Sequence, residues 1–399
     1  MRPRRKDGLK FLVILTVYVI IWLNIGCFTS NRVLNDNKIQ IRNTDSDLAF
    51  TEKIQRTSWK TLQNVSTEQI QRTSRTTLQN VTKITAYDKE LPFHNFSYPL
   101  DVDMVNLIQG YKSTGHVRQR AINNFTQRFL HNPVNRCFIT TGTDNNHTGD
   151  IFLLFVVKSK NDHFDQRNAI RETWGNERYL RKFIIKTVFI LGTPVNESLE
   201  SLNPIWKEIK QFNDIILMDF HDTYFNNTLK TSTSFNWVPE FCPQARFVVL
   251  VDDDIYVSLE TLVIYLEHLP LRKHAQLYMG QTYMGYKPHR NSTSKWYVPV
   301  SEYPWDAYPS FISAGTVIMT MDFVKDVRIA MRYTKLFRLD DIYLAILAYK
   351  LGVVPVTNKN VYGYQVMFGS TKYSDLLTSH GFTPQQLKLF WNAHVRTIQ

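Results

Sequence analysis

Three consecutive carboxylates, Asp252, Asp253 and Asp254, are the residues of this chain whose types and spacing point most directly to chemistry. They follow Phe247–Val251, an apolar and largely β-branched run that is typical of a buried strand. Open α/β sheets bind ligands at the carboxyl ends of their strands. Adjacent carboxylates repel one another unless a cation lies between them, and hard divalent cations prefer oxygen ligands. The pattern predicts a metal site that bridges carboxylate to phosphate, with a solvated acidic turn as the alternative.

Two arginines form a second candidate group. Arg167 and Arg171 are four residues apart in a predicted helix and therefore share one face. Guanidinium groups suit phosphate, so the pair could contact an anionic ligand. A structural ion pair would explain the same spacing, and the sequence leaves both interpretations open.

Further candidates lie in the last third of the chain. Asp340 and Asp341 open an apolar helix that runs to about Leu351, although acids at a helix start commonly serve only as caps. His380 stands alone, and a lone histidine is more often structural than a ligand. A cluster of aromatic and polar residues precedes these acids. Aromatic rings beside polar groups suit the apolar faces of sugars, but they are also ordinary core features. The aromatic residues are Trp296, Tyr297, Tyr303, Trp305 and Tyr308, and the polar residue among them is Glu302.

The elements that must position these residues alternate between short strands and helices. Strands are expected at 151–157, 187–191, 215–220 and 247–251, and helices after 157, at 199–212, toward 241 and at 259–269. This alternation predicts an α/β fold, with a mostly parallel sheet and helices on both faces.

Composition bounds the class of protein. The 399 residues are 43% hydrophobic, which is enough for a sizeable core. The formal charge of +12 raises the question of nucleic acid. The basic residues are scattered, however, and no nucleic-acid motif is present, so we exclude nucleic acid as a partner.

The amino terminus predicts membrane anchoring. Residues 1–10 are strongly basic, and the apolar stretch 11–28 is just long enough to span a bilayer. No convincing cleavage site follows it. The positive flank keeps the amino terminus cytoplasmic, so the chain is predicted to be a single-pass type II membrane protein with a luminal remainder.

Sequons and cysteines agree with a luminal location. Of the three cysteines, Cys27 lies in the anchor, which leaves Cys137 and Cys242 for one disulfide in an oxidising lumen. All Asn-x-Ser/Thr sequons follow the anchor; they are Asn64, Asn80, Asn95, Asn124, Asn146, Asn196, Asn226 and Asn291.

Residues 29–134 are expected to form a luminal stem, followed by a folded domain at 135–399. The stem is polar and contains a tandem repeat over 52–83, whose two copies of 16 residues are too few to build a solenoid. Residues 101–131 are more apolar and are expected to pack as a helical lead-in to the domain.

Taken in order, the motifs resemble the β-1,3-galactosyltransferase branch of glycosyltransferase family 31 over roughly residues 135–399. The motifs that carry the resemblance are Arg167-x-x-x-Arg171-x-Thr173-Trp174-Gly175, Asp222-x-Tyr224-x-Asn226-x-Thr228-Leu229-Lys230-Thr231, Asp252-Asp253-Asp254-x-Tyr256-Val257, Lys295-Trp296-Tyr297, Tyr308-Pro309 with Gly315, Asp341-Ile342-Tyr343, and His380 with Pro384.

The resemblance implies a GT-A, Rossmann-like fold and an inverting enzyme that transfers galactose from UDP-galactose in β-1,3 linkage to a glycan on protein or lipid. It also implies a Mn²⁺ ion and Golgi residence. The roles it implies for this chain are metal ligands Asp254, Asp252 and His380; catalytic base Asp341; donor contacts Arg167, Arg171, Lys230 and Asp253; and acceptor contacts Trp296, Glu302 and Tyr308.

Three departures from the family pattern stand out. Asp340 replaces the usual Glu, Ile312 replaces a usual Cys, and a second usual Cys near Gly369 is missing. Transfer of N-acetylglucosamine or N-acetylgalactosamine remains an alternative activity. A different kind of protein, an inactive luminal carbohydrate-binding protein, is the remaining interpretation.

Overall fold

The structure is a computed structural model of the chain, and it describes residues 98, 102–126, 128–138, 150–180, 182–194, 202–270, 275–370 and 372–398. The predicted anchor at 11–28, the repeat at 52–83 and the sequons Asn64, Asn80, Asn95, Asn146 and Asn196 lie outside these residues. Within them, no helix combines the length and the apolar character needed to cross a bilayer.

An eight-stranded mixed sheet forms the centre of the domain. Its order is β1-β4-β3-β2-β5-β8-β7-β9. Strands β4, β3, β2 and β5 run parallel to their neighbours in that set, β8 is antiparallel to β5 and β7, β1 is antiparallel to β4, and β9 is parallel to β7. The bounds are β1 Phe129–His131, β2 Ile151–Lys158, β3 Ile185–Thr193, β4 Ile215–His221, β5 Ala245–Asp252, β7 Tyr278–Tyr283, β8 Phe311–Thr320 and β9 Val356–Thr357.

The sequence predicts the parallel half of this sheet but not the antiparallel half. Strand β8 lies in a region that the sequence indicates to be rich in loops. Its apolar run is interrupted by Ser313, Ala314 and Gly315, so it lacks the continuous hydrophobic pattern of β2 and β5. In the described part of the chain, four of the seven pairings in this sheet are parallel, which agrees with the expectation of a mostly parallel sheet. The three antiparallel pairings were not predicted.

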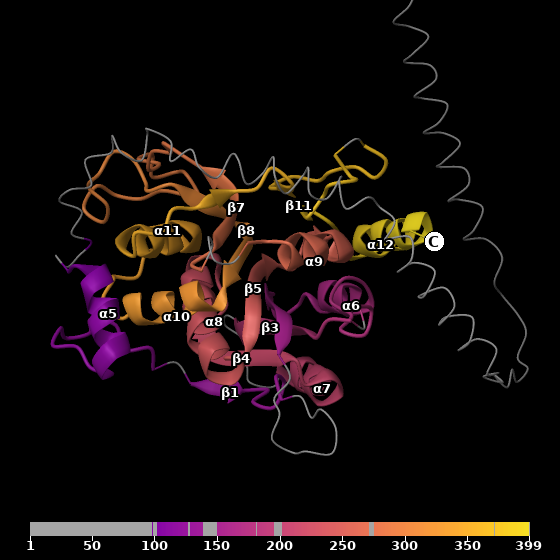
Figure 1. Cartoon of the computed structure of the whole chain (residues 1–399), viewed down its shortest axis with the longest axis horizontal. Helices are drawn as coiled ribbons and strands as arrows, with labels where there is room; N and C mark the ends of the chain where they lie inside the picture. The colour runs from indigo at the N-terminus through magenta and orange to yellow at the C-terminus, as the bar shows by residue number, and fades with distance from the viewer. Residues whose placement is uncertain are drawn as a thin grey trace, which may run out of the picture. The chain divides into compact units, whose positions relative to one another are not determined.

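Helices cover both faces of the sheet, as expected (Figure 1). One face carries α5, α8, α10 and α11, and the other carries α6, α7, α9 and α12. Strand β5 serves both layers, because Val248 and Leu250 point into the first core while Val249 and Val251 point into the second. The bounds are α5 Met104–Thr114, α6 Phe164–Glu172, α7 Asn203–Phe212, α8 Asn227–Phe241, α9 Leu259–Glu267, α10 Met321–Ala330, α11 Asp340–Lys350 and α12 Pro384–Ile398.

A small second sheet lies beside the end of β5. It has the order β10-β11-β6, with β10 Val361–Tyr362, β11 Thr378–His380 and β6 Ile255–Val257. Strand β11 is antiparallel to β6 and pairs His380 with Ile255, the residue after Asp254. This register brings a residue from the end of the chain to the acidic turn.

The folded domain starts before the predicted boundary at 135. The side chains of Met104, Leu107 and Ile108 on α5 are buried in one of the two cores, and β1 extends the main sheet. Helix α5 agrees with the helical lead-in expected at 101–131. Strand β1 has only three residues, which is too short for a hydrophobic pattern that would distinguish this segment from the polar stem in the sequence.

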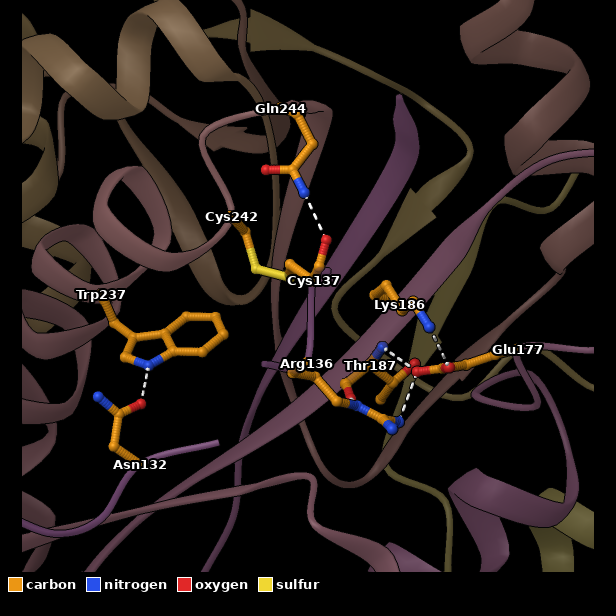
Figure 2. Close-up of a disulfide and its surroundings, with 9 residues drawn as sticks. All are labelled: Asn132, Arg136, Cys137, Glu177, Lys186, Thr187, Trp237, Cys242 and Gln244. Carbon is orange, nitrogen blue, oxygen red and sulfur yellow. Dashed lines mark hydrogen bonds and ion pairs between the residues drawn. A yellow bond between two sulfur atoms is a disulfide. The ribbon is translucent and has the colours of Figure 1, made fainter. Parts of the chain in front are cut away.

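A disulfide joins the segment after β1 to the end of α8 (Figure 2). The structure links Cys137 to Cys242, the pair expected from the sequence, with 5.3 Å between their Cα atoms. Gln244 donates a hydrogen bond from its amide nitrogen to the Cys137 carbonyl (2.5 Å), and Arg136 pairs with Glu177 at 2.6 Å. Figure 2 shows these contacts grouped around the bridge.

We predict that the bridge stabilises the domain mainly by constraining the unfolded chain, since it closes a loop of 105 residues. Reducing the protein should lower the free energy of unfolding by roughly 2–5 kcal/mol. Guanidinium denaturation with and without reductant measures this difference. The double variant Cys137→Ala/Cys242→Ala is the control, because reductant should leave its unfolding curve unchanged. Equal stability of the oxidised and reduced wild-type protein would contradict the prediction.

Candidate active site

Two carboxylates and an imidazole meet at the carboxyl end of β5. One ligand atom from each of Asp252, Asp254 and His380 lies within 4.8 Å of the other two. The Nε2 atom of His380 is 3.4 Å from the Oδ2 atom of Asp254. Asp252 ends β5, and the short turn into β6 places Asp254 beside the paired strand that ends in His380.

The backbone around this cluster fits a bound ion. At Gly315 of β8, an added Cβ would lie 3.1 Å from the His380 ring and 4.0 Å from a carboxylate oxygen of Asp252. Glycine thus keeps space beside the ligand atoms. Carboxylate oxygens and an imidazole nitrogen are both common ligands of divalent metals. The three residues predicted as metal ligands are therefore brought together in an arrangement that could hold the ion.

The electrostatics of the cluster also favour a cation. Burial raises the pKa of Asp252, and the positive charge of Lys158 offsets part of that increase. Burial also raises the pKa of Asp254, with the charge on His380 acting in the opposite direction. A divalent cation between these groups would stabilise their charged forms.

Lys158 links this cluster to the start of α11, and the sequence did not indicate it. It lies opposite Asp252 in the parallel register of β2 and β5. Its ammonium group is 3.0 Å from Asp252 Oδ1 and 2.8 Å from Asp340 Oδ2, and its side chain is only 4% exposed. Burial alone would lower the pKa of Lys158, but the charges of Asp252 and Asp340 outweigh it and raise the pKa.

The two acids at the start of α11 have different environments. Burial alone would raise the pKa of Asp340. The positive charge of Lys158 and a hydrogen bond donated by the hydroxyl of Thr231 (3.0 Å) both lower this pKa, and together they outweigh the effect of burial. For Asp341, burial and then the negative charge of Asp340 raise the pKa to about 7. Asp340 thus stays charged as a partner of Lys158, while Asp341 can take up a proton near neutral pH.

Breaking the ion pairs of the buried Lys158 should be costly for stability. We expect Lys158→Met to lower the free energy of unfolding by roughly 3 kcal/mol, since Asp340, whose side chain is 12% exposed, loses its cationic partner. Asp252 adds little to this loss, because its side chain is 32% exposed and water can solvate it. The matched control is Lys160→Met, because Lys160 is 56% exposed and pairs with exposed Asp162. Thermal or denaturant unfolding at pH 7 measures both variants. A change of less than about 1 kcal/mol in Lys158→Met would show that these ion pairs are not a structural link.

The predicted donor residues Arg167 and Arg171 make structural ion pairs. Arg167 is fully buried, and both of its outer nitrogens contact protein acceptors, including Glu208 at 2.7 Å. Arg171 binds Asp214 and Glu208, each at 2.8 Å. Of the two interpretations that the sequence left open, these contacts favour the structural one.

The other two predicted donor residues also have protein partners. The ammonium group of Lys230 lies 2.8 Å from Asp222 and donates a hydrogen bond to the carbonyl of Ser159 (2.6 Å). Asp253 accepts a hydrogen bond from the Ser159 hydroxyl (2.6 Å) and lies 2.9 Å from Nδ1 of His163. These contacts tie Asp253 to the loop after β2, and Asp253 is not one of the three residues whose ligand atoms meet at the end of β5.

The predicted acceptor residues divide between surface and core. Trp296 is 48% exposed, and its indole N–H donates to the hydroxyl of Tyr224 (3.1 Å), which is itself exposed. Glu302 forms an ion pair with Arg338. Tyr308 is only 4% exposed and packs 5.0 Å from Tyr303 between ring centroids, which is the position of a core residue and not of a sugar platform.

Three of the predicted glycosylation sites lie in the described part of the chain. Asn124 and Asn291 are exposed, whereas Asn226 is half-buried. The side-chain amide of Asn226 donates a hydrogen bond to the carbonyl of His221 (2.7 Å). The hydroxyl of Thr228, in the same sequon, donates a hydrogen bond to the carbonyl of Phe337 (2.6 Å).

Comparisons with known proteins place this site in a family. Residues 165–359 match the family model described as galactosyltransferase. Mouse β-1,3-galactosyltransferase 1 is 32% identical over 278 residues, which cover 70% of this chain and 82% of the relative. The chain belongs to this galactosyltransferase family. The resemblance drawn from the motifs is thereby confirmed.

Other relatives in the family carry a different donor in their names. Lactosylceramide 1,3-N-acetyl-β-D-glucosaminyltransferase of Xenopus tropicalis is 36% identical over 252 residues, covering 61% of this chain and 66% of the relative. A second form from Xenopus laevis is 39% identical over 248 residues and covers 58% of this chain and 63% of the relative. The chain thus spans about two thirds of the length of these two relatives.

Two solved structures show a distant similarity to the chain. A bifunctional glycosyltransferase, WbbM, aligns with a TM-score of 0.36 and 12% identity, covering 63% of this chain and 50% of that structure. The galactosyltransferase LgtC, in complex with donor and acceptor sugar analogues, aligns with a TM-score of 0.35 and 10% identity, covering 61% and 95%. Similarities at this level carry no argument about the present chain.

Proposed function

We propose that this member of the galactosyltransferase family is an inverting β-1,3-glycosyltransferase that transfers galactose from UDP-galactose to a hydroxyl group of a glycan. The observation that carries the proposal is the linkage through Lys158. This residue ties the candidate metal ligands at the end of β5 to the helix start that presents Asp341, a carboxylate with a pKa of about 7.

The chain's own residues can perform a single displacement. Asp341 would accept the proton of the acceptor hydroxyl. The oxygen of that hydroxyl would form a bond to the anomeric carbon of the donor sugar, while the bond from the anomeric carbon to the UDP oxygen breaks. A base with a pKa near the working pH suits this proton transfer. No protein nucleophile is needed for inversion at the anomeric carbon.

A Mn²⁺ ion held by Asp252, Asp254 and His380 would act as a Lewis acid toward the charge that develops on the departing UDP. The ammonium group of Lys158 pairs with both Asp252 and Asp340, and so links the metal-ligand cluster to the start of α11. The GT-A, Rossmann-like fold that the family resemblance implies is part of this proposal.

A second donor is supported by the Xenopus relatives, whose names specify N-acetylglucosamine transfer. Full-length protein should therefore be incubated with UDP-galactose, UDP-N-acetylglucosamine and UDP-N-acetylgalactosamine, each with a panel of glycan acceptors. We expect release of UDP that needs both acceptor and Mn²⁺, fastest with UDP-galactose, and loss of activity on chelation. Binding of glycans without UDP release from any donor would instead support a carbohydrate-binding protein.

We also propose that the protein resides in the Golgi membrane with the folded domain in the lumen. The support is the basic segment at 1–10, the apolar stretch at 11–28 and the sequons beyond it. In sealed microsomes, added protease should spare the carboxyl-terminal portion, and detergent should abolish that protection. Digestion of this portion in intact vesicles would contradict the topology.

A further inference from the structure

Tyr98 packs into the folded domain, although the sequence places it in the predicted stem. Its side chain is only 3% exposed. Between ring centroids, it lies 6.1 Å from Tyr303 and 6.3 Å from Trp305, and 6.1 Å from Phe337 on another segment. The ring pairs are tilted or edge-on, which aromatic pairs prefer over face-to-face stacking. A polar spacer would leave such a ring in water, so Tyr98 is part of the domain.

Helix α5 holds this part of the chain on the domain. Asp103 caps the helix by accepting a hydrogen bond from the backbone N–H of Asn106 (3.0 Å). Near the end of the helix, Lys112 pairs at 2.5 Å with Asp326 of α10, a carboxylate that is only 2% exposed. Helix α5 also lies against α10 (Figure 1). Because Tyr98 comes shortly before this anchored helix, its ring is held against its neighbours.

The neighbours of Tyr98 belong to two segments that flank the candidate active site. Tyr303 and Trp305 lie in the loop before β8, and Phe337 lies just before α11, whose first turn contains Asp341. The rings of Tyr303 and Phe337 are themselves 5.8 Å apart. Tyr98, Tyr303, Trp305 and Phe337 therefore form one aromatic cluster, which joins the loop to the start of α11.

The position of Asp341 depends on the backbone of the segment that the cluster holds. Its carboxylate accepts a hydrogen bond from the N–H of Ile342, its neighbour in the chain (2.8 Å), so the side chain follows the backbone at the helix start. Just before this point, the carbonyl of Phe337 accepts a hydrogen bond from the hydroxyl of Thr228 (2.6 Å), and the ring of Phe337 packs against Tyr98.

We propose that Tyr98 is a positioning residue for the transfer reaction, because its ring fixes the backbone segment that carries Asp341. The inference rests on the proposed function, in which Asp341 is the base. The ion pair between Lys158 and Asp340 holds one end of residues 337–341, and the aromatic cluster holds the other end. Removing the Tyr98 ring would leave a space that its neighbours only partly fill by shifting. A displacement of about 1 Å at a reacting group can lower the rate roughly 10²-fold.

The first test is steady-state kinetics of full-length Tyr98→Ala and Tyr98→Phe, with the donor and acceptor on which the wild type acts. We expect Tyr98→Ala to lower kcat by roughly 10–100-fold. The KM for the donor should change little, because the candidate metal ligands lie at the end of β5 and on β11. Tyr98→Phe keeps the ring and should restore most of kcat.

The matched control truncates another buried side chain of the same amino-terminal segment. Ile108 on α5 is 4% exposed and belongs to the same core as Tyr98, but it is not a ring of the cluster. Ile108→Ala should lower the melting temperature and keep wild-type kcat, when both variants are assayed at a temperature where circular dichroism shows them folded. Because Asn95 and Ser97 form a sequon just before Tyr98, the mass of that peptide must show the same glycosylation state in all samples.

A second test does not depend on activity. Hydrogen exchange of the full-length protein, read by mass spectrometry, reports local opening of the backbone. Tyr98→Ala should speed exchange in peptides that cover residues 301–308 and 337–343. Ile108→Ala and Tyr98→Phe should leave exchange in both regions as in the wild type.

Three outcomes would overturn the inference. They are wild-type kcat in Tyr98→Ala, an equal loss of kcat in Ile108→Ala, or faster exchange in Tyr98→Ala that is confined to residues 98–114. Failure of the proposed function looks different, since no donor would then release UDP even with the wild type. In that case the exchange of residues 337–343 decides whether Tyr98 positions this segment: faster exchange in Tyr98→Ala alone supports it, and unchanged exchange overturns it.

Discussion

Replacing Asp341 with Asn should lower turnover by roughly 10²–10⁴-fold, because Asn keeps the shape of the side chain but cannot accept the proton of the acceptor hydroxyl. Asp341 accepts a hydrogen bond from the backbone N–H of Ile342 (2.8 Å), and the amide oxygen of Asn can accept the same bond. The affinity for donor should therefore change little. Steady-state kinetics of UDP release, together with donor binding, separate the two effects.

The pH profile gives this prediction a second readout. The pKa of Asp341 is raised to about 7, so the carboxyl group is mostly protonated below that pH and cannot act as a base. In the wild type, kcat/KM should fall about tenfold for each pH unit below 7 and level off above it. The residual activity of Asp341→Asn should not show this fall in kcat/KM below pH 7.

The thermal stability of the same variant follows from the sign of that pKa shift. A carboxyl group whose pKa is raised on folding stabilises the native state fully only below its unfolded pKa, and this contribution is lost as the pH rises through about 7. Removing the carboxylate should therefore not lower the melting temperature at pH 8.

The control for Asp341 is another acid at a helix start. Asp322 lies in the first turn of α10 and is exposed, so Asp322→Asn changes a comparable helix position without touching the site. It should keep wild-type turnover and the wild-type pH profile. Near-normal turnover of Asp341→Asn would remove this residue from the mechanism and leave Asp340 or Glu302 as the next candidates.

The elements that could be predicted from the sequence are those whose signal is local. The apolar run of β2 and the run that ends at Asp252 are continuous, and each marks a strand that is buried on both faces. Because the strands are parallel, their carboxyl ends meet at one edge, which is why the acidic turn could be predicted as a site. His380 came from the family resemblance, since the pairing of β11 with β6 leaves no local signal.

What could not be predicted depends on partners that are distant in sequence. Lys158 looks like an ordinary polar residue at a strand end until the register sets it opposite Asp252 and beside Asp340. The role of Arg167 depends on Glu208, which lies 41 residues away and binds its guanidinium group. The spacing of the arginines restricts them to one helix face but says nothing about which anion that face meets.

Replacing Asp254 with Ala should weaken Mn²⁺-dependent binding of the UDP-sugar by at least roughly 100-fold, since even residues that only support a metal ligand cost 10–100-fold when removed. The protein should remain folded. The backbone carbonyl of Asp254, which accepts hydrogen bonds from Gly381 (3.0 Å) and Phe382 (2.9 Å), is retained in the variant. Asp162→Ala removes a 69% exposed carboxylate elsewhere and should bind donor normally.

Calorimetric titration with UDP-galactose, in Mn²⁺ and in chelator, distinguishes two explanations of the acidic turn. If Asp254 is a metal ligand, the Mn²⁺-dependent part of the affinity disappears in Asp254→Ala alone, whereas an unchanged dependence on Mn²⁺ would identify Asp252–Asp254 as a structural turn.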